Sequence, residues 1–165
     1  MASDQAPGRG TGMQPANRFE RIAVELSPDW LEQQQRLRDA GEDADPLVPR
    51  TEYFRDSSRS VIASNDSPDV PFAKSLNPYR GCEHGCIYCY ARPNHAYVGL
   101  SPGLDFETKL FVKANAAELL ESEFSKPSYR PKTIMLGGVT DIYQPIERGY
   151  GVTRSILEVM ERVTP

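Results

Sequence analysis

The chain has no cysteine outside one short stretch: its three cysteines all lie between residues 82 and 89 of 165. It also lacks an apolar run approaching the ~18 residues that span a bilayer, and a charged start followed by a signal-peptide core. An odd number of closely spaced cysteines makes a poor disulfide framework, because pairing always leaves one thiol over. We therefore expect a soluble, cytoplasmic protein without a membrane partner, whose thiols serve metal or redox chemistry.

A strong charge of one sign is missing too. The formal net charge is -4, and residues 1–70 hold 13 acidic and 8 basic side chains against 10 acidic and 11 basic in the rest. No basic stripe with interleaved aromatic residues stands out. Nucleic acid is thus only weakly supported as a partner, and we expect any DNA binding to be weak and lost steeply with salt.

The first part of the chain has few signs of a compact fold. Residues 1–18 consist of Gly, Pro, Ala and polar side chains, which predicts disorder. Residues 19–71 predict an N-terminal extension with one amphipathic helix, capped by Ser27, opened by Pro28 and ended by Gly41. An extended arm interrupted by prolines completes this extension.

From residue 72 onward, strand and helix patterns alternate. The expected elements are an extended run over 73–79, the cysteine loop, a strand over 106–114, a helix over 116–124 with Asn115 and Glu118 as a capping box, a buried strand over 133–138, and a helix over 154–163 capped by Thr153. This alternation predicts an α/β fold with a parallel sheet covered by helices. Because two βα units cannot cover such a sheet, we expect residues 72–165 to be an incomplete domain and the chain to be the amino-terminal piece of a longer enzyme.

The spacing Cys82-x3-Cys86-x2-Cys89 brings three sulfurs toward one centre, which suits tetrahedral zinc or an iron-sulfur cube. A structural zinc site needs a fourth ligand, and the candidates are His84, awkwardly placed between two thiols, and the more distant His95. A cube held by three cysteines leaves one iron without a protein ligand. Three buried structural cysteines are a further alternative, although the neighbouring glycines indicate a loop and not a core strand.

Two stretches, "NPYRGCEHGCIYCYAR" (77–92) and "GGVTDIYQPIER" (137–148), carry a family resemblance. The C-x3-C-x2-C motif with an aromatic residue before its third cysteine resembles the radical SAM superfamily. Together the two stretches are similar to the branch grouped with spore photoproduct lyase and often labelled DNA repair photolyases. The resemblance covers about residues 72–165 and implies the first βα units of a partial (β/α) barrel.

The resemblance also implies a cofactor and its ligands. The three cysteines would bind a 4Fe-4S cluster whose open iron chelates S-adenosylmethionine, and a flavodoxin- or ferredoxin-like protein would donate the electron. Reductive cleavage would then give a 5′-deoxyadenosyl radical that takes hydrogen from a substrate which the sequence does not identify. The residues implied around the cofactor are Tyr88 near the adenine, Gly137 and Gly138 at the methionine amino group, and Thr140 and Asp141 as polar helpers.

These residues have plainer interpretations as well. Gly137 and Gly138 also suit a tight turn, Asp141 a loop cap, and Arg80 and Arg92 a brace for the cysteine loop. The superfamily's later elements fall beyond residue 165, and spore photoproduct lyase uses a further cysteine that this chain lacks, so thymine-dimer repair is not supported. The alternative function is a zinc- or iron-sulfur-binding module without catalytic activity.

Overall fold

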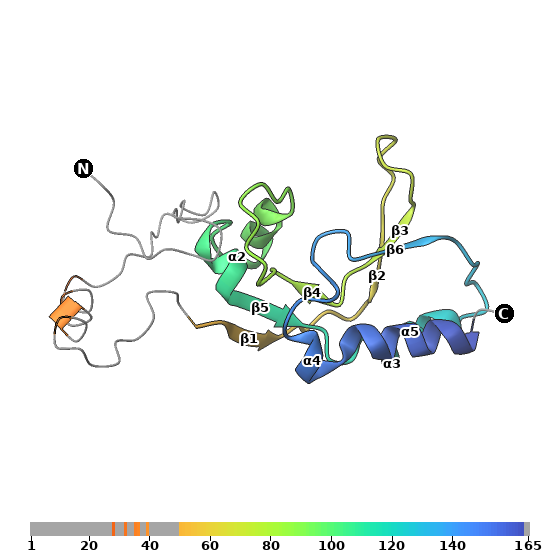
Figure 1. Cartoon of the computed structure of the whole chain (residues 1–165). Helices are drawn as coiled ribbons and strands as arrows, with labels where there is room; N and C mark the ends of the chain where they lie inside the picture. The colour runs from red at the N-terminus through yellow and green to blue at the C-terminus, as the bar shows by residue number, and fades with distance from the viewer. Residues whose placement is uncertain (1–27, 29–31, 33–34, 37–38, 40–49, 164–165) are drawn as a thin grey trace.

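The computed structural model describes residues 28, 32, 35–36, 39 and 50–163 (Figure 1). The predicted disordered segment, 1–18, lies outside these residues, as does most of the predicted amphipathic helix. At each of the described positions between 28 and 39 the backbone is helical. The fold and the site are therefore built from residues 50–163.

Six short strands form two three-stranded sheets. One sheet has the order β1 (Glu52–Arg55), β5 (Lys109–Val112), β4 (Tyr79–Arg80), with β1 parallel and β4 antiparallel to β5. The other has the order β2 (Ile62–Ser64), β3 (Lys74–Leu76), β6 (Ile134–Leu136), with β2 antiparallel and β6 parallel to β3. The chain is thus a mixed α/β protein. In the described part, two small sheets stand where the sequence predicted one parallel sheet, and β1 and β2 of the predicted arm pair with β5 and β3.

Within residues 50–163, five helical segments connect and cover the strands. They are η1 (Arg92–Val98, a 3-10 helix), α2 (Leu104–Thr108), α3 (Ala116–Phe124), α4 (Glu147–Tyr150) and α5 (Val152–Val163). Helices α3 and α5 lie side by side along one flank of the molecule (Figure 1). Helix α3 lies in the connection between the parallel strands β3 and β6, so this part of the predicted βα alternation is confirmed.

The strand predicted over 106–114 is wrong in its first half, because residues 104–108 form α2. The alternating pattern required Glu107 to face solvent, whereas Phe106 and Glu107 are both buried at neighbouring positions. A helix can bury both, since Glu107 reaches Arg92 while the Phe106 ring contacts His95. The tertiary ion pair therefore overrides the local strand pattern.

One predicted helix cap is correct in position only, and the other is wrong. Asn115 occupies the N-cap position of α3 but makes no side-chain cap hydrogen bond. Helix α5 begins before Thr153, whose hydroxyl donates to the carbonyl of Ile142 at 2.7 Å. The cap of α5 comes instead from Glu147, whose carboxylate accepts the backbone N–H groups of Thr153 at 3.0 Å and Arg154 at 3.1 Å.

Glu147 also accepts a hydrogen bond from the hydroxyl of the fully buried Tyr79. Burial alone would raise the pKa of Glu147, but the hydrogen bonds from Tyr79, Thr153 and Arg154 outweigh it and hold the pKa below its usual value. One carboxylate therefore ties β4, α4 and the start of α5 together.

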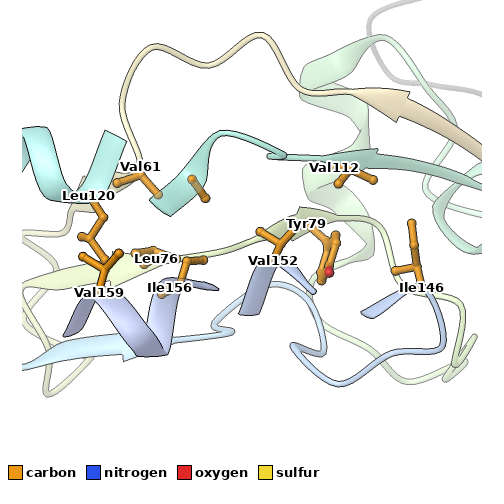
Figure 2. Packing of buried hydrophobic residues seen from close by; sticks show 10 residues of the cluster. Val61, Leu76, Tyr79, Val112, Leu120, Ile146, Val152, Ile156 and Val159 are labelled. Atoms are coloured by element: carbon orange, nitrogen blue, oxygen red, sulfur yellow. The ribbon is translucent and has the colours of Figure 1, made fainter. Parts of the chain in front are cut away.

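The main core lies between the strands and the α3–α5 pair. On α5 the buried residues Val152, Ile156 and Val159 follow helical spacing and face the core. Figure 2 shows side chains from β3, β4, β5, α3 and α5 gathered in one cluster. Its buried members are Val61, Leu76, Tyr79, Val112, Ala116, Leu120, Ile146, Val152, Ile156 and Val159.

No helix in the described part of the chain is both long and apolar enough to cross a membrane.

The core predicts unequal effects at two neighbouring α5 positions. Ile156 is fully buried, so Ile156→Ala should lower the free energy of unfolding by about 2–5 kcal/mol through lost burial and a residual cavity. Leu157 is 39% exposed, so Leu157→Ala should cost less than about 1 kcal/mol. Urea unfolding followed by circular dichroism measures both, and equal losses would contradict this packing.

Candidate metal and cofactor site

Three free thiols line one cavity of about 680 Å³. Cys82 is buried, Cys89 is half-buried and Cys86 is exposed. The loop that carries them winds through successive turns: the carbonyls of Cys82, Cys86 and Cys89 each accept the N–H group three residues later. These turns bring the three cysteines to the same cavity, while the single centre that the spacing predicted stays a prediction.

Gly81 fixes the entry into the cysteine loop. Its φ is +79°, and a Cβ there would lie 2.9 Å from the Phe106 carbonyl oxygen and 3.2 Å from the His95 ring. The next residue, Cys82, donates its N–H to the same carbonyl at 2.9 Å. Only glycine allows this close approach in this backbone conformation.

Arg92 braces the cysteine loop, as the sequence suggested. Its guanidinium donates to the carbonyls of Gly85 and Cys86, each at 2.9 Å, and of Gly103 at 3.0 Å, and pairs with Glu107 at 2.5 Å. The side chains of both partners are almost completely buried. Arg80, by contrast, contacts residues 56 and 58 and braces the β1–β2 connection.

The opposite wall of the cavity is the segment 137–142 that follows β6. Gly137 has a φ of +79°, and a Cβ there would lie 2.8 Å from Ile142 Cγ2. A Cβ at Gly138 would meet only Met135 Cγ, at 3.8 Å. Gly137 therefore fits the predicted tight turn, while Gly138 lines the cavity with open space beside it.

Hydrogen bonds join the two walls. The Thr140 hydroxyl donates to the Gly81 carbonyl at 2.7 Å, and the fully buried Gln144 donates to Thr140 at 3.1 Å and accepts the N–H of Glu83 at 3.0 Å. The Tyr90 hydroxyl donates to the carbonyl of Gly138. The walls are thus held by contacts between segments about 50 to 60 residues apart in the chain.

A histidine–carboxylate pair lies at the cavity. His84 Nε2 is 3.3 Å from Asp141 Oδ2, and both side chains line the cavity while remaining partly exposed. Asp141 also accepts the N–H of Tyr143 at 2.8 Å, which is the loop-capping contact the sequence offered as its plainer interpretation. His95 does not line the cavity; its Nε2 lies 2.9 Å from the Lys109 carbonyl oxygen.

Burial raises the pKa of the Cys82 thiol. Backbone hydrogen bonds from His84 and Asp141 oppose this effect, and the charges of Asp141 and Cys89 reinforce it. The neutral thiol is therefore favoured until a cation is present, so metal binding at this sulfur must displace a proton.

The structure brings together all but one of the residues predicted for the cofactor. Gly137, Gly138, Thr140 and Asp141 line the same cavity as the cysteines. Tyr88 does not: its side chain is 86% exposed and lies outside the cavity lining.

Sequence reasoning missed two positioning residues. Gln144 is held in the polar loop between the walls, and the Asn77 side chain accepts the N–H of Val139 at 3.0 Å. Both stand in irregular segments, where no periodic pattern marks a buried amide. Their only sequence signal is their presence in the two quoted stretches.

The thiols are not assembled for a single ion. Among the described residues, no group of three or more His, Cys, Asp or Glu side chains is arranged to hold one metal ion. A tetrahedral zinc with Zn–S distances near 2.3 Å needs sulfurs about 3.8 Å apart. The arrangement therefore offers three thiols around a cavity without a compact one-ion site.

The Arg92–Glu107 pair yields a stability prediction. Arg92→Met should lower the free energy of unfolding by about 3–5 kcal/mol, because the buried Glu107 carboxylate loses the guanidinium beside it. Adding Glu107→Met should recover part of that loss, since no charge then remains buried. Urea unfolding of both variants tests this, with the exposed Arg148→Met as a control expected to change little. A double variant no more stable than Arg92→Met would contradict it.

His95 predicts a pH dependence of stability. Burial lowers its pKa to about 4, against a usual 6.5, with smaller opposing contributions from the Lys109 carbonyl and Asp105. Between these values the unfolded state binds a proton that the folded state does not, so stability is full above pH 6.5 and falls as the pH drops toward 4. The loss should reach about 3 kcal/mol. His95→Gln, which keeps a donor for Lys109, should flatten this part of the stability curve, and an unchanged slope would contradict the assignment.

The chain is similar to known proteins whose names state no activity. No family model matches the chain, and no solved structure matches it. It is 46% identical over 88 residues to the uncharacterized protein Rv2578c of Mycobacterium tuberculosis. This aligned region covers 53% of this chain and 26% of the relative. It is 31% identical over 94 residues to the uncharacterized protein MJ0683 of Methanocaldococcus jannaschii, covering 56% of this chain and 33% of that protein. The chain thus spans about a quarter to a third of the length of these relatives.

Proposed function

We propose that this chain is the cofactor-binding part of a radical SAM enzyme. The observation that carries the proposal is that the three cysteines and the segment 137–141, far apart in sequence, line one cavity. Its volume of about 680 Å³ falls within the ~300–1,000 Å³ usual for small-molecule sites. The parallel β3–β6 pair with α3 in its connection supports a partial (β/α) barrel as the parent fold.

The residues of the cavity fit the cofactors by donor chemistry. Cys82, Cys86 and Cys89 would hold a 4Fe-4S cluster as its three protein ligands. The chain has three cysteines and no fourth, which matches a cluster with one open iron better than a structural zinc site that takes four protein ligands. When bound, the reduced cluster would supply the electron that cleaves S-adenosylmethionine and gives a 5′-deoxyadenosyl radical.

The chain's own residues orient and shield that chemistry. Gly138 leaves space for a ligand's amino end, and its carbonyl already accepts from Tyr90. Asp141 offers a carboxylate oxygen to an ammonium group, and His84 shares that carboxylate. Backbone N–H groups directed at Cys82 would stabilise negative charge on its sulfur.

The compartment, the electron donor and the source of substrate specificity are part of the same proposal. A reducing cytoplasm would keep the thiols free for a cluster. The exposed position of Cys86 would leave one side of the cluster loop accessible to a flavodoxin- or ferredoxin-like electron donor. The substrate would be determined by parts of the longer protein that the relatives contain beyond the matched region.

Anaerobic reconstitution tests the proposal. The chain treated with iron and sulfide should bind both in equal amounts and turn brown, and Cys86→Ala should lose most of that iron because one of three ligands is gone. Addition of S-adenosylmethionine to the reduced protein should shift the electron paramagnetic resonance spectrum of the cluster, since the cofactor binds the open iron.

A matched variant separates the cluster from zinc. His84→Asn removes the imidazole nearest the thiols, so it should leave the iron content unchanged if three cysteines suffice. Stoichiometric zinc without iron or sulfide in anaerobically prepared protein, lost in His84→Asn, would overturn the proposal in favour of a zinc module.

A further inference from the structure

A second cavity, of about 430 Å³, lies between the β1–β2 connection and the start of α3. Its lining includes two arginines, two serines, an aspartate and the N-cap asparagine of α3. These residues are Arg55, Asp56, Ser57, Ser58, Arg59 and Asn115. We call this the arginine pocket; none of its residues belongs to the cysteine cavity.

Within the described part of the chain, the two arginines of the pocket have no acidic partner. Arg55 and Arg59 are exposed, and among the described residues neither guanidinium makes a hydrogen bond or an ion pair. Several other arginines, by contrast, form ion pairs with carboxylates, among them Arg80, Arg92, Arg154 and Arg162. Two like charges at one cavity repel each other, and the attraction of both to a bound anion would offset that repulsion.

The carboxylate of the pocket does not supply that anion. Asp56 is buried, and its Oδ2 accepts from Arg80 at 2.7 Å while its Oδ1 accepts the N–H of Ser58 at 2.7 Å. Lys113, a further buried cation, lies close enough to interact with both Asp56 and Arg80. The acidic side chain on the first turn of α3, Glu118, is exposed and does not line the pocket. Positive charge therefore predominates around the cavity.

The pocket also offers neutral donors. In the part of the chain that the structure describes, the Asn115 side chain makes no hydrogen bond, so its NH2 group can donate to a ligand beside the N-terminus of the nine-residue α3. In the described structure no hydrogen bond of the Ser57 hydroxyl occurs, so it too can donate to a ligand. Guanidinium, hydroxyl and amide donors at a helix N-terminus are the chemistry that binds phosphate oxygens.

We propose that the arginine pocket binds a phosphate group, with Arg55 and Arg59 as the charged ligands and Ser57 and Asn115 as neutral donors. The phosphate could be carried by a free phosphate compound or by the backbone of a nucleic acid strand, because both present the same oxygens. This site does not depend on the cysteines or on the proposed function.

Two probes test the pocket and distinguish the sources. Calorimetric titration of the full chain with inorganic phosphate, at ionic strength held constant with chloride, measures free phosphate. Fluorescence anisotropy of a labelled single-stranded oligothymidylate measures the strand. Arg55→Gln combined with Arg59→Gln should weaken whichever probe binds by about tenfold or more, because charge-assisted hydrogen bonds are lost. For the strand, the slope of log affinity against log salt should fall by about 0.7 for each contact removed.

Matched controls make the result specific. Arg130→Gln combined with Arg148→Gln removes the same charge from exposed arginines outside the pocket and should weaken binding by less than about twofold, since distant charges are screened. Cys82→Ala should bind phosphate like the parent chain, which separates this site from the cysteine cavity. Circular dichroism checks that each variant is folded.

The outcomes are decisive in both directions. Binding of either probe that only the Arg55/Arg59 double variant loses supports the pocket, and the identity of the probe assigns the source. The proposal is overturned if the parent chain binds neither probe. It is also overturned if the two double variants lose binding equally.

Discussion

Carbonyl groups of the irregular cysteine loop point inward, and a single guanidinium satisfies several of them. Arg92 donates to Gly85, Cys86 and Gly103 and carries the charge that buried Glu107 requires. Because a buried backbone acceptor without a partner is costly, the loop keeps this shape only while Arg92 is in place. Lysine cannot substitute, since a point charge does not present several donors in a fixed plane. The positions of the sulfurs therefore depend on a residue outside the cysteine motif.

The same interaction explains where sequence reasoning succeeded and where it failed. The spacing of Cys82, Cys86 and Cys89 predicted sulfurs turned toward one centre, and the structure places all three cysteines at one cavity without a one-ion group among the described residues. The segment 106–108 was predicted as a strand from its alternation, yet Glu107 is buried by a partner 15 residues earlier. A local pattern carries no information about such a partner, so the helix α2 was missed.

The cap prediction for α5 was wrong for a related reason. A hydroxyl or amide one residue before a helical pattern is a local signal, and Thr153 fits it. The cap of α5 is instead a carboxylate from the preceding turn of helix, which Tyr79 on β4 also contacts. For Tyr88, the role near the cofactor that the resemblance implied stays a prediction, because the structure shows only that its side chain is exposed. Positions that depend on neighbouring sequence were predictable from pattern, and the one distant pairing that was foreseen, between the cysteines and residues 137–141, came from the family resemblance.

The hydrogen bond from Thr140 to the Gly81 carbonyl links two parts of the cavity that could otherwise move separately. Gly81 directly precedes the first cysteine, and Thr140 belongs to the wall that faces the thiols. A ligand that displaced the segment 137–142 would have to stretch this bond and pull on the backbone of Cys82. Displacement of one wall by a ligand would therefore also shift the backbone beside the sulfur at the other wall.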